Sequence, residues 1–238
     1  MRVLAIDTAA GACSAAVWHD GVVHQRLVEL SRGHAEALLP LLLATMADAG
    51  CSFRELDLLA VTIGPGAFTG LRVGLAAARG LALASRLPCV GVTTLAAVAA
   101  AVPPAEAAGW PLLVVLDSKR ADLYAQLFTA GAAVGEPALI SPAGLPGLLS
   151  DAQPLAAGPL AAAAVAVAGD GTAMALPALA AAGVPAAAVS SPGYPQAASV
   201  AAIAAVAPAG SLPPPVPLYL RPPATGPQQR PAVAGRPE

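Results

Sequence analysis

The stretch RVLAIDTAAGACSAAVWHDGVVHQRLVE, residues 2–29, decides the fold class because it reads as three strands joined by short turns. Two aliphatic runs come first, and a third run follows the turn signal Asp20-Gly21. Strands joined this closely pair as an antiparallel meander. The sequence therefore predicts a sheet that opens with three neighbouring antiparallel strands.

After residue 29 the pattern changes to alternating helices and strands, which extend a sheet with parallel strands. The expected elements are a helix at 33–49, a strand at 57–64, a helix at 70–86, a strand at 89–92 and a helix ending near 101. The second half is expected to hold strands at 112–117, 122–128 and 165–168, and helices at 141–150, 172–182 and 196–206.

The strand–Asp–turn–strand unit at the start of the chain is repeated weakly from residue 112. We therefore expect an α/β fold of two similar subdomains with mixed sheets, at residues 1–104 and 105–221. The Pro-rich and polar residues 222–238 are expected to form a disordered tail.

Composition excludes several classes of protein. Charged residues make up only 11% of the chain and the formal net charge is −2, unlike a basic nucleic-acid-binding protein or a charge-rich disordered one. Cys13, Cys51 and Cys89 are widely spaced and form no CxxC pair, so we expect reduced cysteines and neither a disulfide framework nor a zinc cluster. Asp7 and Asp170 interrupt the most apolar stretches, which predicts a cytoplasmic protein without a membrane span.

A glycine-rich loop between an expected strand and helix is the most specific motif. The loop consists of Gly64, Pro65, Gly66, Ala67, Phe68, Thr69 and Gly70. Thr69 is expected to cap a helix that starts at Gly70, and such a helix end can hold an anion. The alternative is a tight strand-to-helix connection that lets the helix pack close to the sheet. The motif is neither a Walker A loop nor GxGxxG.

Asp7 and Thr8, at the end of the first expected strand, suit a phosphate or metal site, because carboxylates bind Mg²⁺ and turn N–H groups face phosphates. A second contribution could come from Gly169 and Gly171, which flank Asp170. The alternative, which we favour, is that Asp7 only satisfies backbone groups of its own turn.

The expected helix at 33–49 is apolar nearly all round. One stripe holds Leu38, Leu42, Thr45 and Ala49, and another holds Leu39, Leu43, Met46 and Gly50. A sheet covers only one face of a helix, so another domain or another chain must cover the rest. We favour a partner interface.

The helix at 70–86 has two features relevant to such an interface. Arg72, Arg79 and Arg86 recur every seven residues and lie near one face, whose default interpretation is a solvated stripe. Gly74, Ala78 and Gly80 are small enough to permit close approach of another helix.

Several segments resemble the TsaB (YeaZ) family. They are MRVLAIDTAAGACSAAV at 1–17, RGHAEALLPLL at 32–42, IGPGAFTGLRVGLAAARGLA at 63–82, LPCVGVTTLAAVA at 87–99, LDSKRADLY at 116–124 and PLYLR at 217–221. Ala67 stands where serine is common in the family. TsaB proteins are similar to the sugar-kinase, Hsp70 and actin superfamily, so the resemblance implies two ribonuclease-H-like subdomains.

The resemblance also implies a function. TsaB is a subunit of the bacterial machinery that makes threonylcarbamoyladenosine beside the tRNA anticodon, and it pairs through its first two helices with the catalytic paralogue TsaD. The ATPase TsaE docks on the pair. The implied interface here comprises Leu38, Leu39, Leu42, Leu43, Met46, Arg72, Gly74, Ala78 and Arg79. TsaD carries a metal-binding histidine pair, whereas His19, His24 and His34 form no such pair.

The expectation is therefore a non-catalytic scaffold without metal or cofactor, which meets tRNA only through the complex. Weak nucleotide binding and a homodimer of the free chain stay open. The first alternative is an ATP-hydrolysing or phosphotransfer enzyme that uses Asp7, Thr8 and Gly169–Gly171. The second is a metallopeptidase, which the absent histidine pair disfavours.

Overall fold

A computed structural model describes residues 1–107, 109–152 and 164–221. The first half contains β1 (Arg2–Asp7), β2 (Ala12–His19), β3 (Val22–Glu29), α1 (His34–Asp48), β4 (Leu58–Gly64), α2 (Phe68–Ser85), β5 (Cys89–Thr93) and α3 (Thr94–Ala101). The second half contains β6 (Leu112–Asp117), β7 (Leu123–Thr129), β8 (Ala132–Ile140), α4 (Leu145–Ala152), β9 (Val165–Ala168), α5 (Thr172–Ala181), β10 (Ala186–Ala188) and α6 (Ala197–Val206). The expected tail at 222–238 lies outside the described residues.

The first sheet has the strand order β3-β2-β1-β4-β5. β1 pairs antiparallel with β2 and parallel with β4, so the predicted meander and its parallel extension are both confirmed. Alternate residues of β1 face opposite sides: Leu4 and Ile6 pack under α1 and α2, while Val3 and Ala5 pack against α6. The sheet is therefore covered on both faces.

The second sheet repeats this plan with the order β10-β9-β6-β7-β8. β6 takes the central place of β1, antiparallel to β7 and parallel to β9. α4 and α5 cover one face, and α3 packs on the other through Leu95 and Val98. Two mixed sheets of the same strand order therefore form two similar α/β subdomains, as expected.

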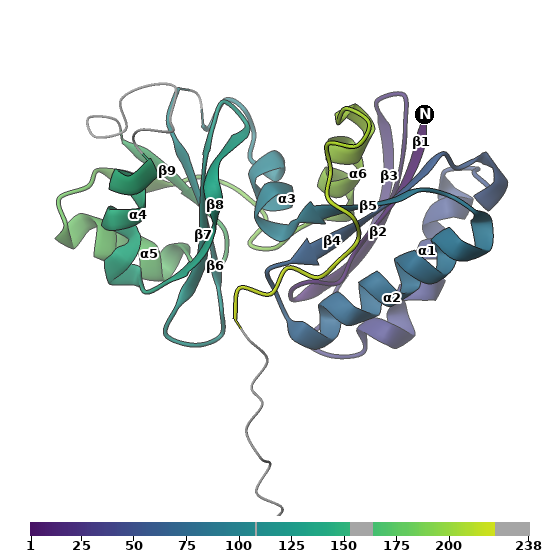
Figure 1. The fold of residues 1–238 in the computed structure, drawn as a ribbon, viewed down its shortest axis with the longest axis horizontal. Helices are drawn as coiled ribbons and strands as arrows, with labels where there is room; N and C mark the ends of the chain where they lie inside the picture. Colours follow the sequence, from purple (N-terminus) through teal and green to yellow (C-terminus); the bar gives the residue numbers. More distant parts are fainter. Residues whose placement is uncertain (108, 153–163, 222–238) are drawn as a thin grey trace, which may run out of the picture.

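The chain returns to the first subdomain at its C-terminal end. α3 and α6 lie between the two sheets (Figure 1). Val200 and Ala201 of α6 pack on the first sheet. Residues 212–221, which we call the C-terminal strap, then cross that sheet, where the Gly91 N–H donates to the Pro213 carbonyl at 2.7 Å. The expected C-terminal subdomain 105–221 is thus corrected, since residues 197–221 pack largely with the first subdomain.

Local sequence explains most boundaries. α3 begins at Thr94, because the Thr93 hydroxyl caps it by accepting the Ala96 N–H at 3.1 Å. β8 and β10 were not expected, since Gly135 and Pro137 interrupt the first and the second is three alanines. Cys13, Cys51 and Cys89 are free, as predicted. Within the described residues, no helix is both long enough and apolar enough to cross a membrane.

Candidate functional site

The turn after β1 and the glycine-rich loop form one tightly packed unit. The Ala67 N–H donates to the Ala9 carbonyl at 2.8 Å, and the Thr8 hydroxyl donates to the Gly70 carbonyl at 2.7 Å. A Cβ on Gly70 would lie 2.1 Å from the Thr8 carbonyl oxygen, and one on Gly66 would lie 2.4 Å from that of Ala9. The glycines are therefore required because two backbone segments are in direct contact. This corresponds to the second interpretation of the motif, a tight strand-to-helix connection.

The predicted cap at Thr69 is wrong. α2 begins at Phe68, and its N-cap is Ala67, whose side chain cannot accept a hydrogen bond. Thr69 lies one residue inside the helix with its side chain exposed. The helix starts earlier because the loop is fixed by the contacts to the β1 turn and needs no side-chain cap.

Asp7 is fully buried at the end of β1. Its Oδ1 accepts the Thr62 hydroxyl at 2.6 Å and the Ala9 N–H at 3.1 Å, so Asp7 does satisfy its own turn. Its Oδ2 is buried and has no hydrogen-bond partner among the described residues. Desolvation by burial outweighs these hydrogen bonds and raises the pKa of Asp7 from 3.8 to about 7.

This carboxyl makes stability depend on pH. Below pH 3.8 Asp7 is protonated in both the folded and the unfolded chain, and between 3.8 and about 7 only the folded chain keeps the proton. The contribution of Asp7 to stability is therefore lost as pH rises through that window, by on the order of 4 kcal/mol. We expect the unfolding free energy of the wild type to fall relative to Asp7→Asn between pH 4.5 and 7.5 in urea titrations. Parallel curves for the two proteins would contradict the shift.

Gly169 and Gly171 pack against β6. A Cβ on Gly169 would lie 2.1 Å from the Val115 carbonyl oxygen, and one on Gly171 would lie 2.6 Å from a methyl of Leu123. Within the described residues no hydrogen bond joins this pair to Asp7 or Thr8. The suggested phosphate site thus consists of two separately packed turns, and phosphate binding there stays a prediction.

The two stripes of α1 have different environments. Leu38, Leu42 and Met46 are at most 4% exposed and belong to the core beneath the helix. Their assignment to a partner interface is wrong for the folded chain, because the sheet already covers them. Leu39 and Leu43 are 52% and 57% exposed. The uncovered stripe is therefore the one that carries Leu39 and Leu43, without Met46.

Two further residues that were predicted to lie at the interface are instead buried inside the molecule. Gly74 and Ala78 are buried on the sheet side of α2. A Cβ on Gly74 would lie 2.5 Å from the Thr8 hydroxyl oxygen, so this glycine permits helix–sheet and not helix–helix approach. Leu83, which sequence reasoning missed, is 83% exposed on the same helix.

Arg72 and Arg79 are exposed as predicted, but they hold the strap. The Arg79 Nε donates to the Pro215 carbonyl at 2.8 Å. Arg72 lies 3.7 Å above the ring of Phe68 and its Nε donates to the Tyr219 hydroxyl at 3.3 Å. This role could not be predicted from the sequence, because the strap is Pro-rich and lacks periodicity.

The family of the chain follows from comparison with known proteins. Residues 22–209 match the model of the TsaD family, described as tRNA N6-adenosine threonylcarbamoyltransferase. The chain belongs to this family. Its curated relatives include TsaB proteins. The tRNA threonylcarbamoyladenosine biosynthesis protein TsaB of Escherichia coli is 39% identical over 124 residues, covering 52% of this chain and 53% of that protein. TsaB of Haemophilus influenzae is 37% identical over 101 residues, covering 42% and 43%. The matches thus span about half the length of these relatives.

A solved structure extends the similarity to nearly the whole fold. YeaZ from Pseudomonas aeruginosa superposes with a TM-score of 0.73 at 27% identity, covering 92% of this chain and 99% of that one. A second structure, described as an uncharacterized protein with similarity to peptidase YEAZ from the same organism, gives 0.74. The resemblance to the TsaB (YeaZ) branch is therefore confirmed.

The histidines of this TsaB-family chain are dispersed. His34 contacts the Ala10 carbonyl through Nε2 at 3.1 Å, and His19 lies beside Asp20. His24 is on the edge strand β3. No group of three or more histidine, cysteine, aspartate or glutamate side chains able to hold a metal ion occurs within the part of the chain that the structure describes.

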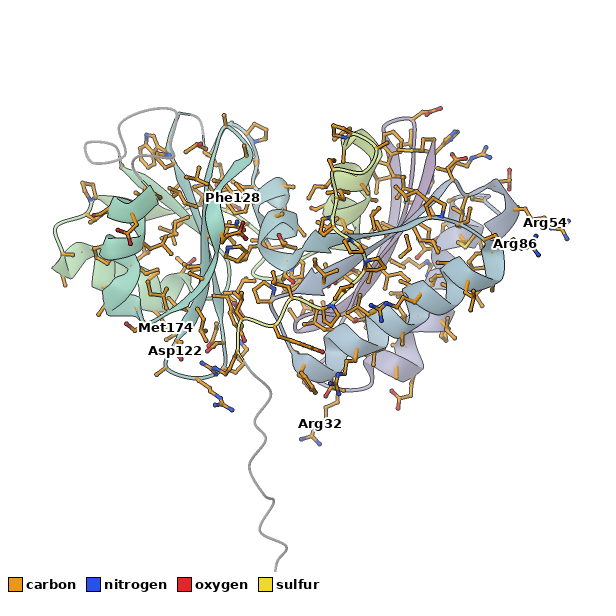
Figure 2. All side chains as sticks on the ribbon, viewed as in Figure 1. Arg32, Arg54, Arg86, Asp122, Phe128 and Met174 are labelled. Carbon is orange, nitrogen blue, oxygen red and sulfur yellow. The ribbon has the colours of Figure 1, made fainter. Side chains whose placement is uncertain are left out.

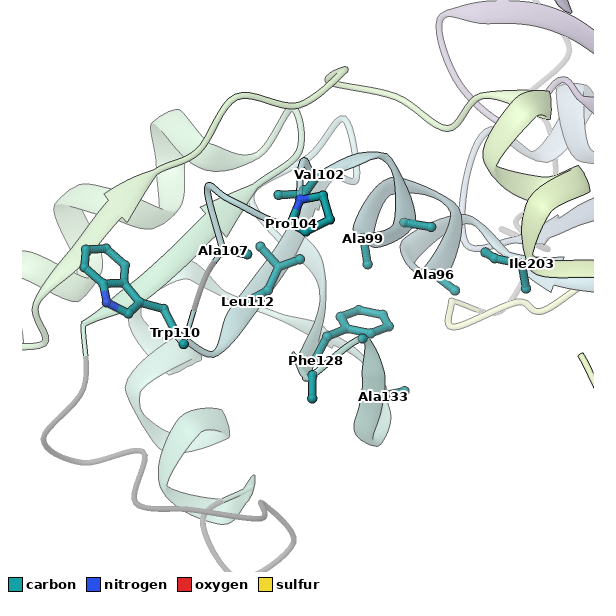
Figure 3. Close-up of a pocket in the computed structure, with 14 residues that line it drawn as sticks. Ala96, Ala99, Val102, Pro104, Ala107, Trp110, Leu112, Phe128, Ala133 and Ile203 are labelled. Atoms are coloured by element: carbon teal, nitrogen blue, oxygen red, sulfur yellow. The ribbon is translucent and has the colours of Figure 1, made fainter. Parts of the chain in front are cut away.

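Two cavities open between the subdomains of this TsaB-family fold. One of about 620 Å³ is bordered by α3, the β7–β8 hairpin and Ile203 of α6 (Figure 3). Its side chains are apolar, with Val102, Leu112, Phe128 and Trp110 among them, so it has no charged group for binding or chemistry. The other, of about 490 Å³, adjoins the glycine-rich loop and is lined by both apolar and polar side chains.

Proposed function

We propose that this chain is the non-catalytic scaffold subunit of the complex that adds a threonylcarbamoyl group to the tRNA adenosine next to the anticodon. Its partner is the catalytic paralogue TsaD, with the ATPase TsaE docking on the pair. tRNA meets the chain only through the complex, in the cytoplasm. The observation that carries the proposal is the uncovered leucine stripe on the outer side of α1, beside α2.

The position of the stripe supports a helical partner. α1 and α2 lie side by side over one face of the first sheet, and their outer surfaces form a two-helix layer (Figure 1). Leu39, Leu43 and Leu83 remain exposed on that layer. A partner of the same fold has an equivalent helix pair, and two such pairs can stack as a four-helix bundle. Burying the leucines would stabilise the complex by about 25 cal/mol per Å².

The enzymatic alternatives find less support. Asp7, Thr8, Gly169 and Gly171, on which an ATP-hydrolysing activity would rest, are each engaged in packing or turn contacts. A metallopeptidase needs a cluster of metal ligands, and the described residues hold none. A homodimer of the free chain through the same helix layer would compete with TsaD.

The proposal predicts activity only in combination. The purified chain alone should transfer no threonylcarbamoyl group to tRNA and should cleave no peptide. TsaD of the same organism should gain at least tenfold in transfer when the chain is added, measured as labelled threonine incorporated into tRNA in the presence of the remaining pathway components. Robust threonylcarbamoyl transfer or peptide cleavage by this chain without TsaD would contradict the scaffold function. Full activity of TsaD without this chain would equally contradict it.

A further inference from the structure

β3 is an edge strand of the first sheet, because the strand order is β3-β2-β1-β4-β5. Just past the end of β3, the Leu30 N–H donates to the Gly11 carbonyl at 3.0 Å. Bonded positions alternate along an antiparallel pair, so the even-numbered residues of β3 bond to β2 and the backbone groups of the odd-numbered ones point away from the sheet. These outward residues are Val23, Gln25, Leu27 and Glu29. Within the residues that the structure describes, no other backbone group bonds to them on the outer side.

The other three sheet edges of the described residues are protected against pairing. On β5, the Gly91 N–H donates to the Pro213 carbonyl of the strap at 2.7 Å. β8 contains Gly135 and Pro137, and β10 has only three residues. β3 has eight residues and contains neither glycine nor proline. A long and regular edge of this kind favours pairing with another strand.

The side chains of β3 are complementary to those of a second, antiparallel copy of β3. With a two-fold axis at Gln25, Val22 of one copy lies opposite Val28 of the other, and Val23 lies opposite Leu27. The axis repeats both pairs, and apolar cross-strand pairs stabilise a sheet. Val22 and Val23 are 58% and 39% exposed in the single chain. Pairing would therefore cover apolar surface that the single chain leaves in water.

Charge favours this register over a neighbouring one. An axis at Arg26 would place two arginines directly opposite each other, which destabilises a strand pair. With the axis at Gln25, Arg26 lies opposite His24, and its guanidinium is already paired with Asp48 at 2.5 Å. Gln25 is held in place by α6, because its Oε1 accepts the Ala198 N–H at 2.7 Å. An uncharged and fixed side chain therefore lies at the axis.

α1 offers a second contact across the same axis. Asp48 at the end of α1 pairs with Arg26 of β3, so this flank of the helix faces the β3 side. Ala37, Leu41 and Ala44 share that flank by their helical spacing and are half-buried. α1 packs over β2 and β3, so the α1 helices of two copies would lie two strand spacings, or about 10 Å, apart. Helices pack at about 8–10 Å, and alanine side chains permit that approach.

We propose that two copies of this chain associate through β3, paired as antiparallel strands about Gln25, so that their first sheets join into one continuous sheet. The association leaves the helix layer open. Leu39 and Leu43 lie on the other side of α1 from the flank that faces β3, so a second copy does not cover the leucine stripe.

Sedimentation equilibrium of the full-length chain tests the proposal, because no other protein is required. We expect a monomer–dimer equilibrium, and Val23→Lys should raise the dimer dissociation constant at least tenfold, because lysine on an edge strand opposes pairing. Val23 is partly exposed in the single chain, so this variant should keep the wild-type melting temperature in circular dichroism. The matched control is Val216→Lys on the strap, where the side chain is 52% exposed, and it should dimerise as the wild type does.

A disulfide tests the register. The two Gln25 Cα atoms would lie about 5.5 Å apart, within the range that a disulfide spans. Gln25→Cys should therefore form a covalent dimer on mild oxidation, seen on a non-reducing gel. Arg86→Cys is the control, because Arg86 is exposed and follows α2, which packs mainly on β4 (Figure 2). Arg86→Cys and the wild type should run as monomers on that gel.

The double variant Leu39→Asp/Leu43→Asp separates this surface from the helix layer. It should dimerise as the wild type does, and its loss of the dimer would place the second copy on the leucine stripe and overturn the proposal. A chain that stays monomeric at its highest soluble concentration would also overturn it, as would wild-type dimerisation of Val23→Lys or a folded Gln25→Cys that forms no covalent dimer. Loss of TsaD binding by Val23→Lys would assign the β3 edge to TsaD instead of a second copy. The scaffold function does not depend on dimerisation, so failure of the dimer leaves it standing.

Discussion

Gly70→Ala is expected to lower the unfolding free energy by about 3 kcal/mol or more, a large share of the stability of a typical domain. The added methyl would lie 2.1 Å from the Thr8 carbonyl oxygen, a backbone atom that cannot rotate away. The β1 turn or the start of α2 must therefore shift, which also breaks the hydrogen bond from the Thr8 hydroxyl to the Gly70 carbonyl. Urea denaturation of the purified chain measures the change.

Gly80→Ala is the matched control, because Gly80 lies on the same helix with nothing within 4 Å of an added Cβ. Alanine has the higher helix propensity, so this variant should be more stable than wild type by about 0.5–1 kcal/mol. Opposite signs for the two substitutions are the signature of backbone contact at Gly70. If Gly70→Ala is as stable as wild type, the tight packing of the loop on the β1 turn is wrong.

The fold class could be predicted because it rests on local patterns. Strand runs, the Asp20-Gly21 turn and the restart at residue 112 are all visible along the chain, and they fix both the meander and the duplication. The position of α6 and the strap could not be predicted. Alanine-rich and Pro-rich segments have no polar face, so nothing in them indicates which of two sheets they cover.

The candidate site could be predicted from the sequence only in part, for similar reasons. The sequence showed that α1 has more apolar surface than one sheet can cover, but leucines on both stripes are chemically alike, so their orientation depends on where the sheet lies. Glycines raised a similar ambiguity. Gly66, Gly70, Gly169 and Gly171 fit a phosphate cradle or a close backbone approach equally well, and only the distances to neighbouring carbonyl oxygens separate the two.

The leucine stripe yields the sharpest binding test. In the double variant Leu39→Asp/Leu43→Asp, the charges are solvated in the free chain, because both positions are about half exposed. The unfolding free energy should therefore change by no more than about 1 kcal/mol. In the complex with TsaD, the same carboxylates would be buried without partners, at a cost of several kcal/mol. The dissociation constant should rise at least a hundredfold, measured by calorimetry or by co-elution in gel filtration.

Two controls make the result specific to the outer side of α1. Val206→Asp changes an apolar residue of α6 that is 78% exposed, on the opposite side of the first sheet, and should bind TsaD as the wild type does. Leu42→Asp places a charge in the core, where the side chain is 0% exposed, and should unfold the chain. A stable Leu42→Asp variant that loses TsaD would reverse the assigned orientation of the helix. A folded double variant that binds TsaD with wild-type affinity would show that the partner docks elsewhere, because two buried, unpaired charges cannot be accommodated without loss of affinity.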